Sequence, residues 1–130
     1  MVNVLITAIG GDIAQGVLKS LQLSRSSLRL IGSDISPYAA GLFLVKRGYV
    51  VAPARKKTQY LEDIIKICRT EKIDIVFACN EEEQYLIAAN LKKLQTQTKA
   101  FFVVQPLSVL TICQDKFKLY QFLTKNKPAA

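Results

Sequence analysis

The chain has 130 residues, is half apolar and carries a formal charge of +8, with 18 lysines and arginines against 10 aspartates and glutamates. A chain of this length is expected to fold around one core. It contains no histidine, which excludes Cys-His nucleophilic catalysis, Ser-His-Asp triads and ordinary zinc sites. Its apolar runs are far shorter than the roughly 20 residues of a membrane-spanning helix, and no signal peptide is recognisable. We therefore expect a cytoplasmic protein with no membrane partner.

Neither the cysteines nor the basic residues form a binding signature. Cys68, Cys79 and Cys113 are odd in number and widely spaced, which argues against disulfides and paired-cysteine metal sites and predicts buried thiols. The lysines and arginines fall in small groups at expected helix ends and loops, without interleaved aromatic residues for base stacking. The sequence therefore predicts no nucleic-acid partner.

Strand and helix signals alternate along the chain. Apolar runs predict strands at residues 2–7, 28–33, 49–51, 73–78 and 100–104. A glycine turn at Gly10-Gly11 follows the first strand, and Asp12 with Gln15 forms a capping-box pattern at the head of the next helix. Thr58 is the expected cap of a second helix, and Asn80 with Glu83 repeats the capping box before a third. The third helix is expected to run through residue 94.

This alternation predicts an α/β fold with a doubly wound, mainly parallel five-stranded sheet of order 3-2-1-4-5. Near-continuous apolar strands imply helices on both faces of the sheet. In this order the connections leave strands 1 and 4 in opposite directions, which opens a crevice at their carboxyl ends. We therefore expect the loops at residues 8–12 and 79–83 to meet and form the site.

The glycine turn does not match a dinucleotide fingerprint. The three fingerprint positions are occupied by Ala8, Gly10 and Ile13, and only the middle one is glycine, so no nicotinamide cofactor is expected. Gly10 remains a candidate for close approach of a substrate. Gly11 and Gly16 are expected to relieve crowding where the helix crosses the sheet.

The acidic candidates allow two interpretations each. Asp34 ends the second strand, where it is either a substrate-binding acid or the cap of the turn at Ser36-Pro37. Glu83, which follows Asn80 in the other loop, either binds a cation or an amine substrate or serves the helix dipole. For Glu81 and Glu82 the dipole interpretation is preferred.

The C-terminal segment has no place in a domain that its fifth strand already closes. A short helix is expected at residues 108–113, and Asp115 is the predicted cap of another. The apolar stripe of that last helix is Leu119, Phe122 and Leu123. The segment is therefore predicted to begin another unit, and as an alternative its stripe could dock on a partner protein.

Four segments carry a family resemblance: VLITAIGGDIAQGVLKSL, LIGSDISPYAAGLFLVKRGYVVAP, IDIVFACNEEEQYLIAANL and VLTICQDKFKLYQFLTKN. Together they resemble the Rossmann-like domain that precedes the ATP-grasp fold in proteins similar to the carbamoyl-phosphate synthase large subunit. The resemblance implies a pre-ATP-grasp domain at residues 1–106, which helps frame a small-molecule substrate and binds no dinucleotide. Residues 107–130 would begin the ATP-grasp region, where the Asp115-Lys116 pair matches and Lys116 would reach the nucleotide.

In such enzymes the ATP-grasp domain binds ATP and magnesium and forms an acyl-phosphate. The chain ends before the corresponding glycine-rich loop and magnesium-binding acids, so it is expected to be a fragment or truncated product that is inactive alone and binds no cofactor. The leading hypothesis is the substrate-side domain of an ATP-dependent carboxylate-amine or carboxylate-thiol ligase, with its ATP-grasp domain in cis. The alternative is a free-standing Rossmann-like module for a small ligand or nucleotide. Association with further copies is left open.

The expected substrate-binding residues are Gly10, Gly11, Asp34, Asn80 and Glu83. No catalytic residue and no metal ligand is predicted.

Overall fold

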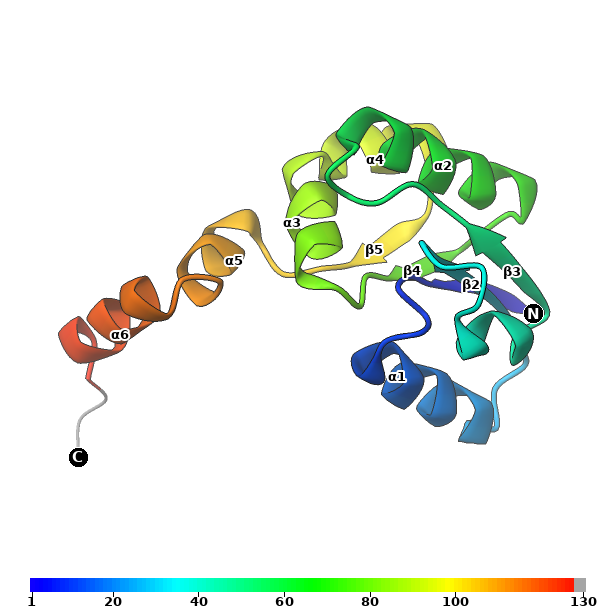
Figure 1. The fold of residues 1–130 in the computed structure, drawn as a ribbon, viewed down its shortest axis with the longest axis horizontal. Coiled ribbons are helices and arrows are strands. Elements are labelled where there is room, and N and C mark those ends of the chain that lie inside the picture. Colours follow the sequence, from blue (N-terminus) through cyan, green and yellow to red (C-terminus); the bar gives the residue numbers. More distant parts are fainter. Residues whose placement is uncertain (128–130) are drawn as a thin grey trace.

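The computed structural model describes residues 1–127, and residues 128–130 at the end of the predicted second unit lie outside it. It is a five-stranded parallel sheet of order β3-β2-β1-β4-β5, which confirms the predicted topology (Figure 1). The strands are β1 (Val2–Ile6), β2 (Leu28–Asp34), β3 (Arg47–Val50), β4 (Ile75–Phe77) and β5 (Phe101–Val103). The helices are α1 (Asp12–Leu23), the 3-10 helix η1 (Ala40–Phe43), α2 (Lys57–Thr70), α3 (Glu81–Ala89), α4 (Leu91–Thr98), α5 (Leu107–Cys113) and α6 (Lys116–Lys125).

Helices cover both faces of the sheet, as the continuous apolar strands predicted. Successive side chains of a strand point to opposite faces, so Leu5 joins the core beneath α2, α3 and α4, while Val4 and Ile6 join the smaller core against α1. Figure 1 shows α1 on one side of the sheet and these three helices on the other. Within the described part of the chain, no helix is long and apolar enough to cross a membrane.

Two predicted helix caps are wrong. The N-cap of α1 is Gly11, and Asp12 is instead the first helical residue, where its Oδ1 accepts a hydrogen bond from the Ile13 N–H at 2.9 Å. Gln15 does not complete a capping box, because its Nε2 donates to the Ile9 carbonyl at 2.7 Å. Helix α2 begins at Lys57, one residue before the predicted cap Thr58. Both helix ends are fixed by backbone geometry rather than by a side-chain cap.

The predicted third helix divides into α3 and α4 at Asn90. The backbone of Asn90 leaves the helical region at φ −118° and ψ 17°, and its Nδ2 donates to the Leu86 carbonyl at 2.8 Å. An asparagine side chain competes for backbone groups and so favours such a break. The break lets α4 turn and place Leu94 in the larger core.

Of the three cysteines predicted to be buried, only Cys68 and Cys79 are; Cys113 is exposed at the end of α5. Its position reflects the arm formed by α5 and α6, which extends away from the sheet (Figure 1). Helix α5 packs against α3, and Gln114 Nε2 donates to the Glu81 carbonyl at 3.1 Å. None of the residues of α6 is buried, and Phe122 and Leu123 of the predicted stripe are exposed.

Candidate functional site

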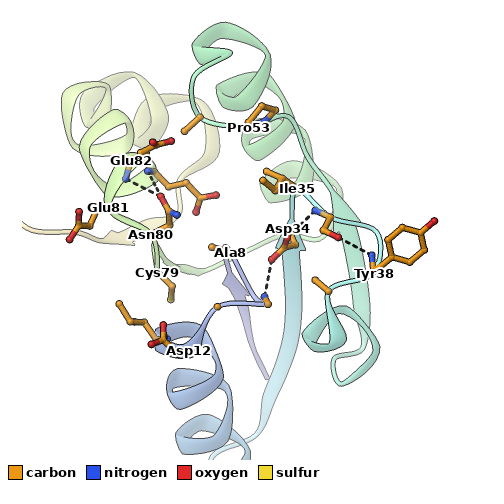
Figure 2. A pocket seen from close by; sticks show the side chains of 17 residues that line it. Ala8, Asp12, Asp34, Ile35, Tyr38, Pro53, Cys79, Asn80, Glu81 and Glu82 are labelled. Carbon is orange, nitrogen blue, oxygen red and sulfur yellow. Dashed lines mark hydrogen bonds between the residues drawn. The ribbon is translucent and has the colours of Figure 1, made fainter.

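A pocket of about 790 Å³ opens where β1, β2 and β4 end. Its walls come from four stretches, within residues 8–13, 34–39, 53–54 and 79–83. Figure 2 shows the first stretch below Asp34, with Asn80 and its neighbours facing them across the opening. The two loops predicted to meet therefore do so, and Gly10, Gly11, Asp34, Asn80 and Glu83 all line this pocket.

The glycine turn allows the backbone to approach the end of β2 closely. A Cβ on Gly10 would lie 2.9 Å from the Ala39 Cβ and 3.0 Å from Asp34 Oδ2, distances that force a shift. At Gly11 a Cβ would lie 3.3 Å from the Ala8 carbonyl, a milder contact. Gly16 has nothing within 4 Å, so the expectation that it relieves crowding is wrong.

The Asp34 side chain connects the glycine turn to the loop after β2 by hydrogen bonds. Its Oδ2 accepts a hydrogen bond from the Gly10 N–H at 2.8 Å, and its Oδ1 accepts one from the Ser36 N–H at 2.9 Å (Figure 2). The structure therefore shows Asp34 as the cap of the turn at Ser36-Pro37. Because each oxygen already accepts a backbone hydrogen bond, Asp34 brings negative charge to the pocket wall and also holds its shape.

Asn80 caps α3 as predicted, with its Oδ1 accepting hydrogen bonds from the N–H groups of Glu82 at 2.9 Å and Glu83 at 3.2 Å. The Glu83 side chain, however, does not return to its own helix start. It turns to the residue that follows β1, where the Thr7 hydroxyl donates to Glu83 Oε2 at 2.5 Å. The capping box is thus half formed, because a tertiary partner replaces the local one.

The environment of Glu83 changes the acidity of three side chains. Burial raises the pKa of Glu83, and the charges of Asp34 and Glu82 add to this effect, while the hydrogen bond from Thr7 opposes it. Burial, with the Glu83 charge, raises the pKa of the Cys79 thiol to about 11. Burial and the same charge raise the pKa of Tyr60 above its ordinary value. A buried carboxylate with a raised pKa in a pocket is a reasonable candidate for function.

Thr7 and Tyr60 were not identified from the sequence. Both are fully buried behind the pocket wall, and neither carries a local pattern beyond that of a core residue. The one feature that could have identified Thr7 is its position, as a hydroxyl residue at the end of an apolar strand that leads into the site. Lys116, expected to reach a nucleotide, is exposed at the start of α6 and does not line the pocket.

The pocket fits neither a metal nor a phosphate. Among residues 1–127, no group of three or more Cys, Asp or Glu side chains is arranged to hold a metal ion. The Gly10 N–H, which would face a pyrophosphate in a dinucleotide site, is used by Asp34. The described side chains that line the pocket include five carboxylates and no lysine or arginine, a setting that disfavours an anion.

Comparisons with known proteins agree with the fold. The ADP-L-glycero-D-manno-heptose-6-epimerase of Helicobacter pylori is 16% identical, with a TM-score of 0.55 over 92% of this chain. A Rossmann-fold NAD(P)-binding family protein of Shigella flexneri is also 16% identical, with a TM-score of 0.50 over 78% of this chain. The chain spans 50% of the length of each of these structures. No curated protein matches the sequence.

A family model described as the PylC-like N-terminal domain matches residues 4–101. This supports a pre-ATP-grasp type of domain, whereas the finer likeness to carbamoyl-phosphate synthase stays a prediction. Because the matched residues make up most of the chain and include every wall of the pocket, the protein belongs to the PylC-like N-terminal domain family.

Proposed function

We propose that this chain is the N-terminal, substrate-side domain of an ATP-dependent ligase of the ATP-grasp type, and that its pocket binds an amine-bearing small molecule. The family assignment supports the first part of the proposal. The charge of the pocket supports the second. A ligase that joins a carboxylate to an amine must hold the amine partner, and a domain without catalytic machinery of its own could supply that binding site.

The uneven distribution of carboxylates is the observation that carries the proposal. Half of the ten acidic residues line the pocket, although the chain as a whole has a net charge of +8. They are Asp12, Asp34, Glu81, Glu82 and Glu83. A concave site lined by one sign of charge concentrates ligands of the opposite sign. An organic ammonium is the favoured ligand, since the described residues offer no arrangement for a metal ion.

The apolar part of the wall suits the remainder of such a ligand. Ile13, Ile35 and Tyr38 line the pocket and are largely exposed, and Tyr38 stands at the rim opposite Glu81 (Figure 2). Ligand sites combine apolar walls with a few charged groups that fix orientation. The pocket therefore favours a ligand with an alkyl stem that ends in an ammonium group.

ATP and magnesium would belong to the ATP-grasp domain and not to this pocket. An acid-lined pocket whose turn amide is already occupied does not fit phosphates. When bound, ATP would activate a carboxylate for attack by the amine. Lys116 is the described residue that the resemblance assigns to the nucleotide, and it lies on the arm outside the pocket. The chain alone is therefore proposed to bind substrate without catalysing a reaction.

Calorimetry on the isolated chain tests the proposal with matched probes. We expect 1,5-diaminopentane to bind with an affinity that falls as salt is added, because charge dominates the contact. The uncharged isostere 1,5-pentanediol and the dianion glutarate should give no heat of binding. Equal binding of the diol and the diamine would contradict the amine proposal.

The alternative is a free-standing module for a nucleotide or another small ligand. One observation favours it: the pocket is complete within residues 8–83, before the arm begins. Titration with ATP, ADP and NAD separates the two functions. Micromolar binding of any of these nucleotides to the isolated chain would favour the module, whereas the ligase-domain proposal predicts little or none.

A further inference from the structure

The five carboxylates of the pocket are not equivalent. Asp34 already accepts backbone hydrogen bonds on both oxygens. Asp12, Glu81 and Glu82 are exposed in the first turns of α1 and α3, where acidic residues stabilise a helix without any ligand. Glu83 is buried like Asp34 and lines the pocket as well, but only one of its oxygens accepts a hydrogen bond.

One oxygen of Glu83 is held and the other is free. Oε2 accepts the hydrogen bond from Thr7, whereas Oε1 accepts no hydrogen bond from any described residue. Among the described residues Oε1 is not one of the buried atoms that lack a partner, so it is accessible from the pocket that Glu83 lines. Oε1 is therefore the oxygen of Glu83 that a ligand in the pocket would contact.

The hydrogen bonds around Thr7 fix which way its proton points. The Cys79 N–H donates to Thr7 Oγ1 at 3.3 Å, so this oxygen is an acceptor from the backbone. Its single hydroxyl proton is then directed to Glu83 Oε2. The hydrogen bonds that run from the loop after β4, through the residue after β1, to α3 therefore set the orientation of the carboxylate.

A second hydroxyl lies beside this chain without being part of it. Tyr60 of α2 is fully buried, and its hydroxyl has no hydrogen-bond partner among the described residues, so it takes no part in orienting Glu83.

We propose that Thr7 is a positioning residue that aims Glu83 Oε1 into the pocket, and that Glu83 is the carboxylate that pairs with the ammonium group of the ligand. This assignment rests on the proposed amine-binding function. The groups that face Glu83 are Tyr60 from α2, Asp34 from the end of β2, Cys79 from the loop after β4, and Glu82 from α3 itself. Because only the carboxylate form attracts an ammonium, binding should weaken as the pH falls through the pKa of Glu83.

A ligand-free measurement tests the positioning. Carbon-13 NMR of the glutamate carboxyls reports the pKa of Glu83, identified by its loss in Glu83→Gln. Thr7→Val removes a hydrogen bond that favours the charged form and should raise this pKa, while Thr7→Ser should restore it. An unchanged pKa in Thr7→Val would overturn the positioning role.

The second measurement is the pH profile of 1,5-diaminopentane binding, followed by calorimetry in the same variants. Thr7→Val should weaken binding about tenfold at neutral pH, as expected for a lost hydrogen bond to a charged group, and should move the midpoint of the profile to higher pH. Thr96→Val, whose hydroxyl bonds only within α4, is the control and should change neither quantity.

The two measurements distinguish a failure of the proposed function from a failure of the roles assigned to Thr7 and Glu83. In the first case Thr7→Val changes the pKa of Glu83, but the wild-type protein binds no diamine. The amine-binding function and the pairing of Glu83 with an ammonium are then wrong, while the positioning of Glu83 by Thr7 is retained. If diamine binds and Glu83→Gln leaves its affinity unchanged, the proposed function survives and the assignment of Glu83 is overturned.

Discussion

Glu71 stabilises the fold through its charge, and Glu71→Gln measures how much. The residue follows α2, and its side chain is 3% exposed. Its carboxylate accepts hydrogen bonds from Arg29, from Arg47 at 3.1 Å and from the Tyr49 hydroxyl. The Tyr49 hydrogen bond, with those from both arginines, lowers the pKa of Glu71 from 4.5 to about 2, against the opposing effect of burial.

The magnitude follows from this pKa. At about 1.4 kcal/mol for each pH unit, the lowering corresponds to about 3 kcal/mol of stability. Arg47 is largely exposed, its side chain being 61% accessible, so solvent screening reduces the expected contribution to about 2 kcal/mol. Because the folded-state pKa is depressed, this stability is fully present above pH 4.5 and is lost as the pH falls towards 2.

Urea unfolding of wild type and Glu71→Gln at several pH values is the assay. The variant should be less stable by about 2 kcal/mol at pH 7, and the difference should shrink steadily below pH 4.5. Glu62→Gln, at an exposed position of α2, is the matched control and should stay within about 0.5 kcal/mol of wild type at every pH. A difference between wild type and Glu71→Gln that does not change with pH would refute the reasoning, because it would then not come from the charge.

Further predictions concern backbone geometry, each measured by thermal unfolding. Gly16→Ala should stabilise the protein by about 1 kcal/mol, since Gly16 lies within α1 with nothing near its missing Cβ. Gly10→Ala should destabilise it, because the new Cβ would meet Ala39 and the carboxylate that closes the turn; a neutral Gly10→Ala would contradict the close approach. Lys99→Gly should stabilise the protein by about 1 kcal/mol because Lys99 has a φ of 61° at the end of α4. The same change at exposed Lys92 inside α4 should cost about 1 kcal/mol, and equal effects at the two lysines would contradict the strain at Lys99.

The sheet could be predicted because its signals are local. Each strand is an apolar run bounded by turn residues, and the order follows from the alternation of strands with helices. The strand ends were less accurate: β4 is Ile75–Phe77, shorter than the predicted 73–78. Strand ends depend on hydrogen bonds to neighbouring strands, which a single segment does not reveal.

The location of the site was predictable for a topological reason, since the carboxyl ends of β1 and β4 must lie together in this strand order. The roles of its residues were not. Asn80 with Glu83 fits a capping box, and only the partner 76 positions away, Thr7, shows where the glutamate turns. The Glu71 cluster was missed for the same reason, because its partners come from β2 and β3.

The helix caps show the limit of local patterns. Asp12 followed by Gln15 is a good capping-box sequence, but the turn closes one residue earlier at Gly11, with the Gly11 N–H donating to the Ala8 carbonyl at 2.9 Å. Ala8 supports that turn with a φ of 47°, a conformation that an alanine seldom adopts. Tertiary closeness to the end of β2 therefore determines the turn.

The central claim is that the acidic pocket binds the ammonium end of a small molecule, and NMR mapping of a 1,5-diaminopentane titration tests it most directly. The account predicts saturable shifts at the backbone amides of Gly10, Ser36 and Glu83, which border the Asp34 and Glu83 carboxylates, with none at Lys92 and Lys93 on α4. Shifts spread over the whole surface, or absent from these three amides, would contradict it.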